Sequence, residues 1–80
     1  MKKLNNNLTE HEMNILKLLA KGYSHKEISA IIGTSSVSAV NKTLHILSRK
    51  FGVSGQVNIL RSALINGMLH LRDLRREYHE

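Results

Sequence analysis

Residues 24–51, SHKEISAIIGTSSVSAVNKTLHILSRKF, contain two helix-forming segments joined by a short run of turn-forming residues. In the first segment, Ser24 and Glu27 form the S-x-x-E pattern of a capping box, and Gly33 ends the helix after about two turns. The second segment has apolar residues at steps of three and four, which predict one buried stripe: Val37, Val40, Leu44, Leu47 and Phe51. The stretch therefore predicts a short helix, a tight turn and a longer helix.

The same signals predict one helix before this stretch and another after it. Thr9 and Glu12 form a second capping box, and Gly22 ends that helix. A fourth segment starts near Ser54, and its apolar residues fall on heptad a and d positions: Val57, Leu60, Leu64, Leu71, Leu74 and Tyr78. The heptad is broken only at Gly67, which allows this helix to extend past the compact core. No capped segment alternates apolar and polar residues as a β-strand does. The predicted fold class is therefore all-α, a four-helix domain with a helix-turn-helix in its middle.

Length and composition indicate one small domain with an aliphatic core. The chain has 80 residues, of which 41% are hydrophobic and only 4% aromatic. So few aromatic rings argue against proteins that bind single strands or RNA by base stacking. No stretch approaches the roughly 20 apolar residues of a membrane span, and the asparagines at positions 5–7 interrupt any signal peptide. We therefore expect a cytoplasmic protein with no membrane partner.

The distribution of charge favours a polyanionic partner. The formal net charge is +6, and no acidic residue lies between Glu27 and Asp73. The same interval holds these cations: Lys42, Arg49, Lys50, Arg61 and Arg72. A basic middle of this kind suits nucleic acid. The alternative is a basic surface that serves only solubility.

The longer predicted helix has a polar stripe opposite its apolar one, made of Ser38, Asn41, Lys42, His45 and Arg49. A major groove about 12 Å wide admits such a helix, and there asparagine pairs with adenine while lysine or histidine donates to guanine. We therefore predict base contacts from Asn41, Lys42 and His45. Phosphate contacts usually fix the register of a bound helix, and the predicted set is Ser24, Lys26, Ser36, Ser38, Arg49 and Lys50. The alternative is the ordinary polar face of a surface helix.

Catalytic and metal chemistry find little support in the sequence. The five histidines, at positions 11, 25, 45, 70 and 79, include no pair three or four residues apart, and there is no cysteine. The few acidic residues lie at cap positions or in the tail, and no glycine-rich phosphate loop is present. We predict a protein that is not an enzyme and has no metal or cofactor.

Two segments resemble the LuxR/FixJ/GerE-type DNA-binding domain. LTEHEMNILKLLAKGYSHKEIS (residues 8–29) is similar to the family's L-T-x-x-E-x-x-V-L-x-L-L-A-x-G-x-S-x-K-E-I-A signature, and KFGVSGQVNILRSALINGML (residues 50–69) to its K-L-G-V and A-x-x-x-G-L segments. The resemblance divides the chain into a disordered arm (1–7), a LuxR-type helix-turn-helix domain (8–69) and a helical extension (70–80). No receiver or ligand-binding domain precedes residue 8, so the chain resembles the family's free-standing members.

The resemblance implies a bacterial regulator whose third helix reads the major groove and whose fourth helix makes dimer contacts. The dimer residues predicted from it and from the heptad are Leu60, Leu64, Met68, Leu71 and Leu74. Val40 takes the place of valine in the family's T-V-K-x-H motif, and Lys42 and His45 take base-facing places. The chain departs from the family pattern in three places. Asn41 and Thr43 replace basic residues, Gln56 replaces arginine, and the turn is one residue longer. These departures lower the expected affinity for phosphates.

These observations predict a sequence-specific regulator of transcription that binds double-stranded DNA as a homodimer, at the nucleoid. The alternative is a stand-alone interaction module that forms a heterodimer with a related regulator through its fourth helix. For residues 70–80, the heptad suggests a dimerising helix, and the alternative is a solvated tail.

Overall fold

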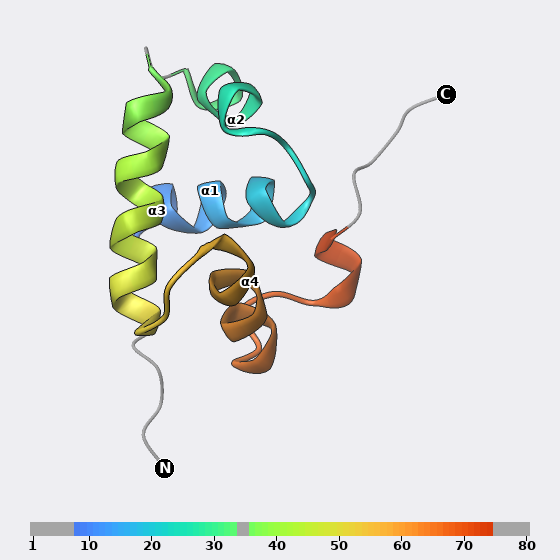
Figure 1. Ribbon diagram of the computed structural model, residues 1–80. Coiled ribbons are helices and arrows are strands. Elements are labelled where there is room, and N and C mark those ends of the chain that lie inside the picture. The colour runs from blue at the N-terminus through green and yellow to red at the C-terminus, as the bar shows by residue number, and fades with distance from the viewer. Residues whose placement is uncertain (1–7, 34–35, 75–80) are drawn as a thin grey trace.

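The computed structural model describes residues 8–33 and 36–74, which form four α-helices and one short 3-10 helix (Figure 1). The elements are α1 (Glu10–Ala20), α2 (His25–Ile32), α3 (Val37–Phe51), α4 (Gln56–Ile65) and η1 (Leu71–Leu74). No strand occurs within these two ranges. The predicted all-α fold with four helices is confirmed.

The longest helix, α3, organises the others. Its 15 residues stand upright in Figure 1, and it contacts α1, α2 and α4. In the same view α1 crosses behind the middle of α3, with α2 above it and α4 below it. The short η1 packs on α1. Because three helices pack on one side of α3, its other side is exposed.

Both predicted capping boxes are formed. The Thr9 hydroxyl accepts from the Glu12 amide at 3.1 Å, and the Thr9 amide donates to Glu12 Oε1 at 3.0 Å. In α2 the corresponding Ser24 and Glu27 distances are 3.1 and 2.8 Å. Each box satisfies amides that the first turn of a helix leaves without an internal partner. The helix starts are therefore determined by local chemistry.

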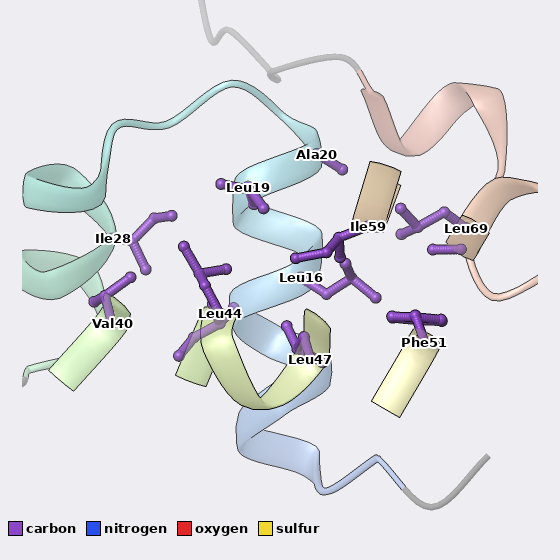
Figure 2. Packing of buried hydrophobic residues seen from close by; sticks show 12 residues of the cluster. Leu16, Leu19, Ala20, Ile28, Val40, Leu44, Leu47, Phe51, Ile59 and Leu69 are labelled. Carbon is purple, nitrogen blue, oxygen red and sulfur yellow. The ribbon is translucent and has the colours of Figure 1, made fainter. Parts of the chain in front are cut away.

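One apolar core joins all the helices (Figure 2). The side chains of α3 that point into it are Val40, Leu44, Leu47 and Phe51, four of the five residues of the predicted stripe; the fifth, Val37, is only partly buried and is not a member of this core. The other members come from α1, α2, α4 and the segment after α4: Ile15, Leu16, Leu19, Ala20, Ile28, Ile59, Ala63 and Leu69. Apart from Phe51 this core is aliphatic, which agrees with the composition.

Two apolar residues lie at the surface, and one of them, Val57, belongs to the predicted heptad. Ile31 of α2 is 54% exposed and Val57 of α4 is 76% exposed. In α4 the buried residues are Ile59 and Ala63, whereas the heptad residues Leu60 and Leu64 are only partly buried against the core. Much of the apolar surface of both side chains therefore stays in contact with solvent.

The extension of the fourth helix that the heptad allowed is not formed, because α4 ends at Ile65. Gly67 adopts a left-handed conformation at φ 77°, the Met68 amide donates to the Ala63 carbonyl at 2.9 Å, and the Gly67 amide donates to the Leu64 carbonyl at 3.1 Å. These two bonds form a Schellman motif, which ends a helix. The chain then turns back and buries Leu69. Tyr78 lies outside the described residues.

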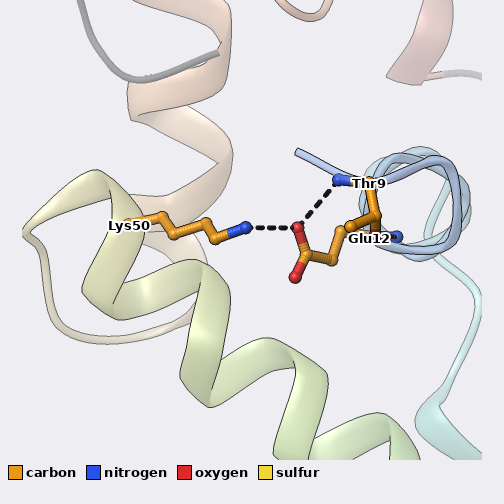
Figure 3. Close-up of polar contacts among 3 residues, drawn as sticks. All are labelled: Thr9, Glu12 and Lys50. Carbon is orange, nitrogen blue, oxygen red and sulfur yellow. Dashed lines mark hydrogen bonds and ion pairs between the residues drawn. The ribbon is translucent and has the colours of Figure 1, made fainter. Parts of the chain in front are cut away.

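An ion pair links α1 to α3 (Figure 3). Lys50 Nζ lies 2.7 Å from Glu12 Oε1, the same oxygen that accepts from the Thr9 amide. Glu12 is buried, with 8% of its surface exposed. The Lys50 ammonium holds the pKa of the Glu12 carboxyl below its ordinary value, and the Thr9 amide adds to this effect, whereas burial opposes it. The charged carboxylate therefore stabilises the folded state.

We predict that Glu12→Gln lowers the free energy of unfolding by about 1–3 kcal/mol at pH 7, because glutamine keeps the cap but leaves Lys50 without its carboxylate. Since folding lowers the pKa of Glu12, its stabilisation is complete above about pH 4.3, the ordinary value for glutamate. It is lost as the pH falls through the lowered pKa. Urea unfolding of both proteins between pH 3 and pH 7 measures the difference.

The matched control is Glu27→Gln, which makes the same change in the exposed capping box of α2. Its effect should be smaller and should vary less with pH. Equal losses in the two variants would contradict a special role for the pair between Glu12 and Lys50.

Candidate nucleic-acid interface

The side of α3 that faces away from the core carries the predicted polar stripe. All of its members are exposed: Ser38, Asn41, Lys42, His45 and Arg49. The cations Lys42 and Arg49 form no ion pair with any residue in 8–33 or 36–74. With 15 residues and a rise of about 1.5 Å per residue, the helix presents a face about 22 Å long. The structure therefore brings the predicted base-contacting residues together on one accessible helix face.

The N-terminal ends of α2 and α3 flank this face. Ser24 is the N-cap of α2, where its hydroxyl accepts from the Glu27 amide, and Lys26 is exposed in the first turn. Ser36 is the exposed N-cap of α3. Helix N-termini offer amides and a positive dipole end to anions. The predicted phosphate contacts in these two turns are thus accessible.

Lys50 does not share the surface of the stripe. Its ammonium points toward α1, where it pairs with Glu12 (Figure 3). Successive residues of a helix are rotated by about 100°, so Lys50 projects well away from Arg49. The position of Lys50 on the helical wheel, which can be read from the sequence, already separates it from the stripe. In this structure Lys50 is a contact between helices.

A groove adjoins the stripe where α3 meets the N-terminal ends of α2 and α4. It encloses about 330 Å³ and is lined by His25, Asn41, Leu44, His45, Ser48, Ser54, Gly55, Gln56 and Ile59. His25 Nε2 and Gln56 Oε1 lie 2.9 Å apart, which ties the first residue of α2 to the first residue of α4. Because these two residues are 31 positions apart, no local pattern in the sequence predicts the pair.

Thr43, which stands at a basic position of the family pattern, lies inside the fold. Its side chain is buried, and the hydroxyl donates to the Ala39 carbonyl at 3.2 Å. Thr43 thus contacts its own helix and offers no charge to a ligand. The exposed cations of α3 are Lys42 and Arg49.

The predicted dimer residues fall into two groups. Leu60, Leu64 and Met68 are partly buried against the core of their own chain. Leu71 and Leu74, on η1, are exposed. The most exposed apolar side chains of α4 are Val57 and Ile65, at 76% and 73%.

The described residues hold few features of other kinds of site. Within 8–33 and 36–74 no group of three or more histidine, aspartate or glutamate side chains is placed to hold a metal ion. Across the same residues no helix is both long and apolar enough to cross a membrane.

Comparison with known protein families gives one match. The model of the family described as bacterial regulatory proteins, luxR family, matches residues 6–63, which is more than half of the chain and includes α1, α2, α3 and most of α4. No curated protein and no solved structure matches the chain. The helix pair α2–α3 and the exposed basic stripe are the parts that DNA binding requires. The chain belongs to the luxR family of bacterial regulatory proteins, which are DNA-binding regulators of transcription.

Proposed function

We propose that this protein binds specific sequences of double-stranded DNA as a homodimer, with α3 in the major groove. The observation that carries the proposal is the exposed stripe on α3, where amide, ammonium and imidazole groups lie on one face with no carboxylate in the helix. Asn41, Lys42 and His45 contact base edges, since these side chains can donate to the groove edges of adenine and guanine.

Phosphate contacts surround this stripe. Ser38 and Arg49 lie at its two ends, and Lys26 supplies a cation from the first turn of α2. Ser24 and Ser36 lie at the helix starts, where backbone amides also point outward. Lys50 is left out of this set because its ammonium is paired with Glu12.

The outer face of α4 supports a homodimer. Val57, Arg61 and Leu64 follow one another at steps of four and three along it, and Leu60 and Ile65 lie beside them. This surface is apolar at both ends, and the described residues leave Val57 and Ile65 uncovered. Two such faces can pack in a symmetric interface. A dimer would present two α3 helices to two half-sites of a palindromic operator.

Selection of bound duplexes from a random pool, at about physiological salt, tests the function first. We expect an enriched motif with two-fold symmetry, and affinity for it that falls steeply with salt as bound counterions are released. Absence of enrichment by protein shown to be folded would contradict specific DNA binding. A module that only forms heterodimers would instead bind a related regulator with weak salt dependence.

For the duplex selected in this way, Lys42→Ala should weaken specific DNA binding by about 1–3 kcal/mol, because a base contact is lost. Arg49→Ala should weaken specific and non-specific binding alike and reduce the salt slope by about one. Fluorescence anisotropy at several salt concentrations measures both. Lys17→Ala is the control, since this exposed lysine lies on α1 outside the stripe. Wild-type affinity in Lys42→Ala would refute the placement of this residue.

Val57→Asp should dissociate the homodimer, because it places two carboxylates in an apolar interface. Sedimentation equilibrium of the free protein measures the change, and thermal unfolding checks that the variant folds. Ile31→Asp makes the same kind of change on α2 and should leave the association constant as it is. If Val57→Asp sediments like the wild type, α4 does not form the interface.

A further inference from the structure

A second groove lies between α1 and α2, apart from the candidate DNA interface. Its volume is about 450 Å³, and it is lined by His11, Asn14, Lys17, Leu18, Ile31 and Ile32. None of these residues belongs to α3 or α4. Whatever occupies the groove therefore need not compete with a ligand on the α3 stripe.

The side of the groove formed by α2 is apolar. Ile32 is half-buried and packs against the core, as does Leu18 of α1, whereas Ile31 is 54% exposed. Burial of an isoleucine side chain on binding would gain free energy that folding leaves unused. The surface therefore favours a partner with an apolar side of its own.

Apart from Leu18, the residues that line the groove from α1 are polar, and Lys17 carries a positive charge. His11, Asn14 and Lys17 follow one another at steps of three and are all exposed. Six residues of helix separate the first from the last, a distance of about 9 Å. The Lys17 ammonium forms no ion pair with the described residues, although it attracts the Asp73 carboxylate of η1 through space. This side can therefore receive carboxylates.

We propose that the groove between α1 and α2 binds a short acidic amphipathic helix of another protein. Its apolar residues would contact Ile31 and Leu18, and its carboxylates would face Lys17 and His11. A groove with one apolar and one cationic side fits a helix that carries apolar anchors at i, i+3, i+4 and i+7. Two turns of such a helix match the span of the polar side.

The charges of this chain argue against a second copy as the occupant. Of its carboxylates in the described residues, Glu12 is paired with Lys50, and Glu27 and Asp73 each accept a hydrogen bond from a backbone amide of their own chain. Glu10 alone is exposed in the first turn of α1 without such a bond among these residues. A partner rich in carboxylates supplies the complementary charge that this basic chain lacks.

A designed peptide tests the proposal. The probe is a cross-linked helix of about 12 residues with leucines on one side and glutamates beside them, because a free helix of this length is marginal in water. Titration into the ¹⁵N-labelled protein, followed by amide chemical shifts, reports affinity and location together. We expect saturable shifts along α1 and α2, and none from a peptide with lysines in place of the glutamates.

Two variants sharpen the result. Ile31→Ser should weaken peptide binding at least about tenfold, and Lys17→Glu should weaken it for the acidic peptide only. Ile46→Ser is the matched control, since it removes an apolar side chain of α3 that is 37% exposed and lies outside the groove, and it should leave the affinity as it is. Thermal unfolding checks each variant.

Several outcomes would overturn the proposal. One is a titration with the acidic peptide that does not saturate, and another is equal binding of the lysine peptide. The others are chemical-shift changes centred on Lys42 and Arg49, or an unchanged affinity of Lys17→Glu for the acidic peptide. A change in sedimentation weight on Ile31→Ser would show that a second copy occupies the groove instead.

Discussion

The inward face of α3 is the constraint on which the rest of the structure depends. A chain of this length buries only about 60–65% of the surface that its unfolded form exposes, so one helix must contact all the others. Val40, Leu44, Leu47 and Phe51 fill this role against α1, α2 and α4. Because those contacts occupy one side of α3, the opposite side is exposed along its whole length. The same packing that stabilises the domain therefore presents the polar stripe.

The orientation of α3 also depends on polar contacts between distant parts of the chain. Lys50 joins the C-terminal end of α3 to Glu12 on α1, and the Glu12 carboxylate caps α1 at the same time. His25 and Gln56 join the starts of α2 and α4 beside the stripe. Both pairs lie at the edges of the core, where a shift of one helix would move the stripe relative to the flanking helix ends. They can stabilise the geometry of the candidate interface without contacting DNA themselves.

The sequence was sufficient for features that neighbouring residues determine. The capping boxes at Thr9 and Ser24 and the stripe of α3 depend on spacings of three and four residues. Both boxes are formed, and the stripe is buried from Val40 to Phe51. It was not sufficient where two signals compete or where partners are far apart. At Gly67 the heptad favoured a longer helix, but left-handed glycine geometry ended it. The pairs of Lys50 with Glu12 and His25 with Gln56 span 38 and 31 residues, and only the packing of the helices brings them together.

The exposed apolar residues lie on two separate surfaces, and we propose a different partner for each. Ile31 and Val57 lie on different helices, and neither contributes to the core cluster. Burial of each would gain free energy only in a complex, and the surroundings of each differ. Val57 lies on the outer face of α4 beside other apolar side chains, which suits a symmetric copy of the same face. Ile31 borders a groove whose other side is cationic, which suits a partner of opposite charge. Since the groove shares no residue with α3 or α4, the acidic helix that we propose would not compete with the proposed contacts to DNA or to a second subunit.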